Sequence, residues 1–74
     1  LVIYKYFKKE TEDFKIMVQV NPESLHGLEL IVLPDKSVQK TKRVFDEEIY
    51  EDLAADEFED CSPLEFNLNL KGIF

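Results

Sequence analysis

Cys61 and His26 are the side chains of this sequence whose types could perform nucleophilic catalysis together. A thiol–imidazole pair also needs a third group that orients the base, and nothing in the spacing supplies one. Glu59 and Asp60 precede the cysteine, and their charge should raise the pKa of its thiol. We therefore expect a half-buried cysteine at a helix exit, a surface histidine beside a turn, and a protein that is not an enzyme.

Sixteen acidic residues raise the question of a metal site or of a carboxylate pair for acid–base catalysis. Glu48, Asp52 and Asp56 are spaced four residues apart, so they would share one face of a helix. A loop-type calcium site needs a glycine turn, and no glycine occurs between Gly27 and Gly72. Two isolated glycines also cannot form a phosphate-binding loop. We therefore expect no metal, no cofactor and no catalytic residue.

Charge is distributed unevenly along the 74 residues, whose formal net charge is −7. Nine of the fifteen residues in 46–60 are acidic and none is basic. A basic run precedes them and consists of Lys36, Lys40, Lys42 and Arg43. Because affinity for phosphates depends on lysine and arginine, we expect that this acidic chain does not bind nucleic acid directly.

The acidic segment is the main functional clue. Like charges four residues apart destabilise a helix, and acidic residues near its C-terminal end oppose its dipole. Either the basic run or a basic partner must then compensate them. The segment is a solvated face that keeps the protein soluble, a docking surface for a basic protein partner, or a mimic of nucleic-acid charge. We expect a small non-enzymatic interaction or regulatory module whose partner-binding residues are Glu47, Glu48, Glu51, Asp52 and Glu57.

Hydrophobic periodicity predicts the elements that position these residues. Strands are expected over residues 1–8, 14–20, 28–33, 38–45 and 64–71, where apolar residues alternate or cluster. A single helical turn that exits at Gly27 and a turn over 34–37 are expected between strands. The one helix is expected over 46–56, with Asp46 as its N-cap and with Phe45 and Tyr50 packed together at its start.

The expected order ββββαβ describes a single α+β domain over residues 1–74. Its sheet is mostly antiparallel, and one helix packs on one face through Ile49 and Leu53. The polar strand over 38–45 fits a sheet edge, because lysines there discourage pairing with another chain.

One helix covers only one face of a sheet, so we expect the other face to be bare. Apolar and aromatic side chains are expected on it, namely Tyr4, Tyr6, Met17, Ile31 and Leu33, and Ile73 and Phe74 would add apolar surface. A contiguous apolar patch marks an interface or a ligand site. The sequence therefore suggests a homodimer through this face or through an edge strand, and, as an alternative function, a binder of a small apolar or aromatic ligand.

Cysteine usage and hydropathy bear on the compartment. A single cysteine cannot form an internal disulfide, so we expect a reducing cytoplasm. No apolar run approaches the length of a membrane span, and no signal peptide is visible. The chain begins at Leu1 rather than at a methionine, so an initiator residue or a processed leader could precede it.

Overall fold

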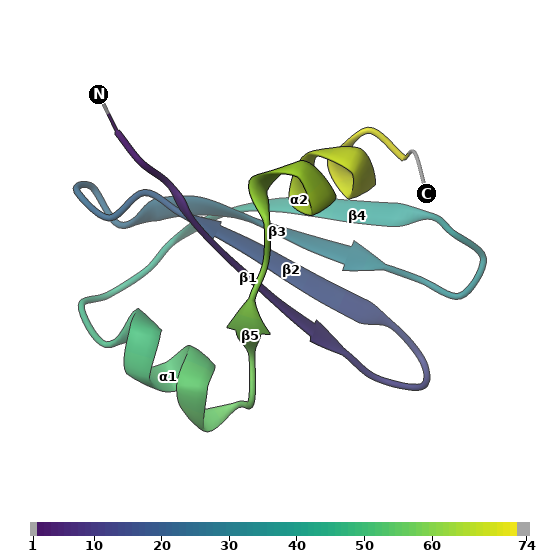
Figure 1. Cartoon of the computed structure of the whole chain (residues 1–74), viewed down its shortest axis with the longest axis horizontal. Helices are drawn as coiled ribbons and strands as arrows, with labels where there is room; N and C mark the ends of the chain where they lie inside the picture. Colours follow the sequence, from purple (N-terminus) through teal and green to yellow (C-terminus); the bar gives the residue numbers. More distant parts are fainter. Residues whose placement is uncertain (1, 73–74) are drawn as a thin grey trace.

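The computed structural model describes residues 2–72, and Leu1, Ile73 and Phe74 lie outside the described residues. Five strands form one antiparallel sheet in the order β4-β3-β2-β1-β5, accompanied by two helices (Figure 1). The elements are β1 (Lys5–Glu10), β2 (Lys15–Val20), β3 (His26–Val32), β4 (Val38–Val44), α1 (Ile49–Ala55), β5 (Glu59–Asp60) and α2 (Pro63–Leu70). The expected α+β class is therefore confirmed.

Short polar turns join the antiparallel pairs β1–β2 and β3–β4. The Thr11 hydroxyl accepts a hydrogen bond of 3.1 Å from the backbone N–H of Phe14. The Asp35 carboxylate accepts bonds from the Ser37 N–H at 2.9 Å and from the Ser37 hydroxyl at 2.6 Å, and these bonds lower the pKa of Asp35. The turn predicted over 34–37 is confirmed, because side-chain acceptors of this kind favour turns over strands.

The connection between β2 and β3 contains the expected helical turn, because the Leu25 N–H donates to the Asn21 carbonyl at 2.8 Å and the Asn21 side chain accepts the N–H groups of Glu23 and Ser24. Its predicted exit at Gly27 is wrong. β3 already begins at His26, so Gly27 lies inside a strand, and Leu25 takes the left-handed backbone conformation with φ of 62°. Glycine suits position 27 because a Cβ there would touch the Gln19 carbonyl oxygen and lie 2.6 Å from the Phe45 ring. Close packing rather than a left-handed exit explains this glycine.

The last element is the helix α2, so the strand predicted over 64–71 is wrong. The Ser62 hydroxyl accepts a 3.1 Å hydrogen bond from the Glu65 N–H, and a proline follows the cap at the first helical position. Alternation of leucine and phenylalanine misled the prediction because Phe66 and Leu70 are also four residues apart. A helix buries both on one side, and the Ser62 cap with the proline after it favours the helix over a strand.

α2 covers one face of the sheet, called here the α2 face. Its buried core consists of Met17, Leu30 and Phe66, and the Tyr6 ring lies 5.2 Å from that of Phe66. Met17 was expected on a bare face but is fully buried, and Ile31 lies on the opposite face, because it follows Leu30 in a strand. The expectation of one helix and one wholly bare face is therefore wrong.

α1 covers the opposite face, called the α1 face. Leu53 is 6% exposed and clusters with Val18 and Val20, while Ile49 packs at the margin of this cluster. The prediction that α1 packs on the sheet through Ile49 and Leu53 is thus confirmed. The sheet is a central layer with a helix on each side, and Figure 1 shows the two helices well apart.

α1 starts later than the sequence suggested. Asp46 does not cap the helix but a turn before it, since its carboxylate accepts the Glu48 N–H at 2.9 Å. Helical geometry begins at Ile49, and the Tyr50 ring lies 6.0 Å from the Phe7 ring of β1. The predicted bounds of 46–56 are therefore wrong by three residues at the start.

β5 was not predicted, because only two residues, Glu59 and Asp60, pair with Lys8 and Phe7 of β1. This pairing makes β1 an interior strand and leaves β4 and β5 at the two edges. The predicted edge position of the lysine-rich strand is confirmed.

Candidate functional site

The five carboxylates that the sequence selected lie on α1 and in the turns at its two ends. They are Glu47 and Glu48 in the turn before the helix, Glu51 and Asp52 in its first turn, and Glu57 just after it. All five are exposed, and we call them the acidic surface. Leu53 packs α1 against Val18 and Val20 of the sheet, and this packing fixes the position of the acidic surface.

Within residues 2–72, no ion pair up to 4.0 Å involves the acidic surface. The pairs found there join Lys8 and Lys15 to Glu10, Glu59 and Glu65, and Arg43 to Glu29. The basic run before α1 therefore does not neutralise the acidic surface by direct pairing. Of that run only Arg43 forms an ion pair in the described part of the chain, at 3.5 Å from Glu29 of the neighbouring strand.

A crevice of about 320 Å³ lies between α1 and the α1 face of the sheet. Part of its wall is apolar and is formed by Val18, Phe45, Ile49, Leu53 and Phe58. Carboxylates also line it, namely Glu29, Asp46, Asp52 and Asp56, together with Arg43, which pairs with Glu29. An apolar wall beside carboxylates suits a lysine or arginine, whose stem is aliphatic and whose end is cationic.

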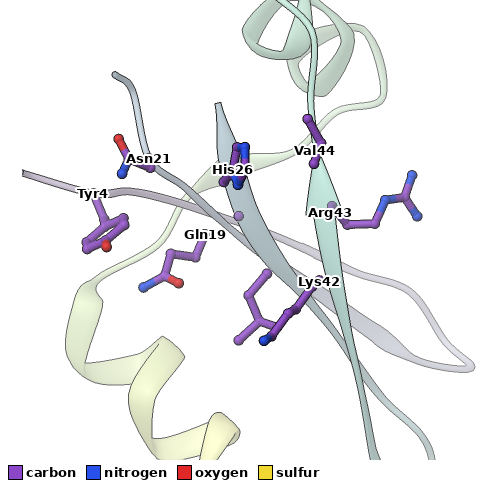
Figure 2. A pocket seen from close by; sticks show the side chains of 9 residues that line it. Tyr4, Gln19, Asn21, His26, Lys42, Arg43 and Val44 are labelled. Carbon is purple, nitrogen blue, oxygen red and sulfur yellow. The ribbon is translucent and has the colours of Figure 1, made fainter. Parts of the chain in front are cut away.

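A second concave region, which we call the hollow, lies on the α2 face and has a volume of about 520 Å³ (Figure 2). It is formed by chain segments far apart in sequence, with Tyr4 preceding β1, Gln19 in β2, His26 at the start of β3 and Lys42 in β4. None of the described residues that line it is acidic. Of the residues expected on a bare face, only Tyr4 lines this hollow.

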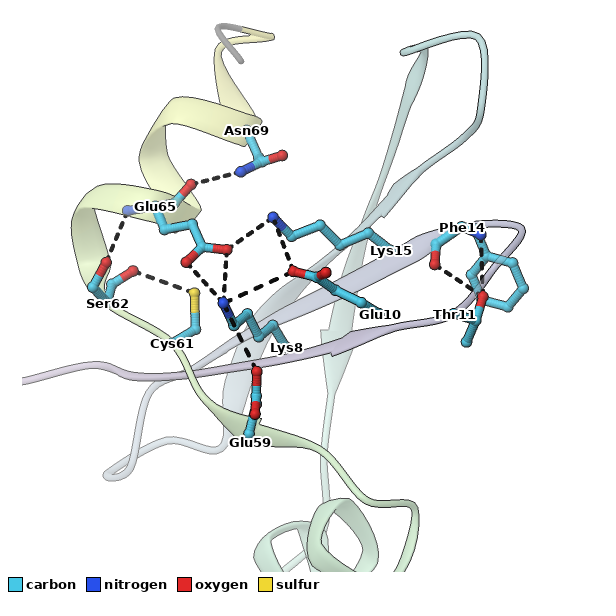
Figure 3. Close-up of polar contacts among 10 residues, drawn as sticks. All are labelled: Lys8, Glu10, Thr11, Phe14, Lys15, Glu59, Cys61, Ser62, Glu65 and Asn69. Carbon is cyan, nitrogen blue, oxygen red and sulfur yellow. Dashed lines mark hydrogen bonds and ion pairs between the residues drawn. The ribbon is translucent and has the colours of Figure 1, made fainter.

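A cluster of charges joins α2 to the sheet (Figure 3). The Glu65 carboxylate accepts hydrogen bonds from Lys8 at 3.0 and 3.2 Å and lies 2.8 Å from the Lys15 ammonium. These bonds lower the pKa of Glu65, and the bond to Glu65 raises the pKa of Lys8. The charges of Glu65 and of the two lysines are thus paired with one another. This indicates that the cluster holds α2 on the sheet and is not a reactive group.

Cys61 and His26 are not brought together. Cys61 follows β5, and its N–H donates to the Tyr6 carbonyl of β1, whereas His26 begins β3, two strands farther across the sheet. β5 and β3 are three strand spacings apart, which amounts to roughly 14 Å and is too far for a proton transfer. Burial is the main cause that raises the pKa of the Cys61 thiol, and Glu65 rather than the neighbouring Glu59 adds to it.

Within the described residues 2–72, no three histidine, cysteine, aspartate or glutamate side chains converge as a metal ion would require. Neither helix in this range has the length and apolar character needed to cross a membrane.

No protein-family model, curated protein or solved structure matches the chain significantly. The function therefore has to be argued from the acidic surface, the crevice and the hollow themselves.

Proposed function

We propose that this protein is a small non-enzymatic interaction or regulatory module whose acidic surface docks a basic protein partner. The observation that carries the proposal is the set of five exposed carboxylates around α1, none of which forms an ion pair within residues 2–72. Repulsion among such charges opposes helix formation, and a basic partner would relieve it. The reducing cytoplasm, where a lone cysteine stays a thiol, is the compartment that we propose.

The crevice beside α1 supports this proposal by offering a place for one basic side chain. A lysine or arginine of the partner would lay its methylene groups against Ile49 and Leu53. Its cationic end would then reach Asp52 and Asp56, which line the same crevice. Charges around the crevice would steer the partner in and set the rate of association more than its final affinity.

Charge reversal at the acidic surface tests the proposal. The protein is immobilised and exposed to cell extract at about 50 mM and about 500 mM salt, since screening weakens exposed charge pairs. We expect a basic protein to be retained at low salt and released at high salt. Replacing Glu48 and Asp52 by lysine should reduce the retained amount about tenfold or more.

The matched control reverses two exposed carboxylates in the β1–β2 turn, Glu12 and Asp13, which changes the net charge equally. This control should retain the partner. An equal loss in both variants would mean that only net charge matters and would contradict a docking site at α1. Retention of nucleic-acid-binding proteins that free DNA displaces would instead favour mimicry of nucleic-acid charge.

The alternative function is the binding of a small apolar or aromatic ligand on a bare sheet face. Two of the residues that suggested it do not lie on such a face. Met17 is fully buried beneath α2, and Ile31 lies on the α1 face. Tyr4 keeps 43% of its surface exposed and contributes to the hollow.

A further inference from the structure

The hollow is the part of the α2 face that α2 leaves open. α2 packs over Met17 and Leu30, while Gln19 and Leu28, farther along the same strands, line the hollow, and Leu28 also packs against the α2 core. Its volume of about 520 Å³ lies within the range of roughly 300–1,000 Å³ that is typical of small-molecule sites. A molecule about the size of a single substituted ring would fit.

The electrostatic character of the hollow is opposite to that of the protein. The chain has a formal net charge of −7, yet the lining contains cationic side chains and no carboxylate. Figure 2 shows the Lys42 side chain reaching inward from β4 on the side of Gln19, whereas the Arg43 guanidinium points away. Arg43 pairs with Glu29, which leaves Lys42 as the lysine that a bound anion would meet.

The remaining walls combine apolar surface with oriented polar groups. Tyr4, just before β1, and Val44, at the end of β4, are 43% and 74% exposed, and Leu28 lies on β3, beside the strand of Val44. The Gln19 amide donates a 3.2 Å hydrogen bond to the Tyr6 hydroxyl, which fixes its orientation beside the hollow. An aromatic ring can therefore lie against Leu28 and Val44 while its charged group faces Lys42.

We propose that this hollow binds a small aromatic anion, with its anionic group on Lys42 and its ring against Leu28 and Val44. The shared chemistry is a flat apolar body that carries a carboxylate or a phosphate. The site is formed on the face opposite α1, so the proposal does not depend on the docking function of the acidic surface.

The test is a titration of the full chain, followed by the backbone amide signals in NMR spectra. The probes are benzoate, phenyl phosphate and the neutral benzamide, with inorganic phosphate as a probe that lacks a ring. We expect benzoate or phenyl phosphate to shift the amides of Gly27, Leu28, Lys42 and Val44 in a saturable way. Benzamide and inorganic phosphate should each bind at least about tenfold more weakly, because each lacks one of the two contacts.

Two lysine variants locate the charge that matters. Lys42→Gln should weaken binding of the aromatic anion about tenfold, because it removes the charged partner. Lys40→Gln is the matched control, since Lys40 lies on the same strand and the same face but does not line the hollow. Both lysines are exposed, so both variants should fold, which unchanged spectra elsewhere in the chain verify.

Several results would overturn the proposal. These are the absence of saturable shifts for both aromatic anions, equal affinity for benzamide, equal losses for the two lysine variants, or shifts confined to α1. A failed capture experiment at the acidic surface would leave this titration unaffected, so failures of the two proposals are distinguishable.

Discussion

A few charged side chains help to hold α2 on the sheet. Glu65 of α2 lies within 3.0 Å of both Lys8 and Lys15, on the neighbouring strands β1 and β2. Its side chain is 31% exposed, so water screens the attraction in part. One carboxylate shared by two lysines is nevertheless worth more than an isolated surface pair, because one ordered side chain serves both bonds.

Replacing Glu65 by glutamine should lower the free energy of unfolding by about 1 kcal/mol near pH 7. The folded pKa of Glu65 is lowered below its ordinary value of 4.5, chiefly by hydrogen bonds to Lys15 and Lys8. Its stabilisation is therefore complete above the unfolded pKa and is lost as the pH falls through the folded pKa. Urea unfolding at about pH 7 and about pH 3 should show the difference between wild type and variant shrinking in acid.

The control for this residue is Glu12→Gln, in the exposed β1–β2 turn. It should change stability by less than about 0.5 kcal/mol at either pH. A gap between wild type and Glu65→Gln that grows in acid would show that the carboxylate is not held by the lysines in the way described.

Among the helices and strands, the sequence predicted correctly those in which the spacing of apolar residues fits only one kind of element. Val18 and Val20 are two residues apart, and both are buried on one face as expected. α2 was missed because alternation at Phe66 and Leu70 fits a strand as well as a helix. The decisive signal was local, namely Ser62 followed by a proline and, three residues after the serine, by Glu65.

Of the candidate sites, too, one could be predicted from the sequence and one could not. The acidic surface could be named from the sequence, because its charges are neighbours along one short segment. The hollow could not, since Tyr4, His26 and Lys42 come to one face only through the pairing of β1, β2, β3 and β4. Its existence also depends on α2, whose position decides which part of the face remains open.

β4 is an open edge, and its lysines bear on self-association. The Phe45 N–H donates to the Leu25 carbonyl, and the alternation of an antiparallel ladder then directs the backbone groups of Lys40 and Lys42 outward. If two copies paired antiparallel through the middle of β4, Lys40 of one copy would face Lys42 of the other. Like charges placed directly opposite each other destabilise such a pair.

Replacing Lys40 and Lys42 together by threonine should therefore increase edge-to-edge association. Sedimentation velocity over a range of concentrations should show a larger dimer fraction than for wild type. Lys5→Thr with Lys9→Thr removes the same charge from the interior strand β1 and serves as control. Association that rises equally in both double variants would attribute the effect to net charge rather than to the β4 edge.

The whole molecule is a sheet between two helices, and each helix contributes few buried side chains. Leu53 is the buried residue of α1, and α2 contributes Phe66 and Asn69. A chain of 74 residues has a stability of roughly 4–11 kcal/mol by the usual scaling per residue. Because Met17 and Val18 are neighbours on β2 but face opposite helices, loss of either helix exposes one side of the same central strand.

Phe66→Ala should consequently unfold the domain as a whole rather than release α2 alone. Phe66 is fully buried, so its truncation should cost about 3–5 kcal/mol, a large share of the total. Leu64→Ala is the matched control in the same helix, because Leu64 is 69% exposed and should lose less than about 1 kcal/mol. Amide exchange should report the change in α1 as well as in α2, since both pack on β2. Protection that persists around Leu53 while the signals of α2 disappear would show that the helices are separate cooperative units, and the acidic surface would then keep its structure without α2.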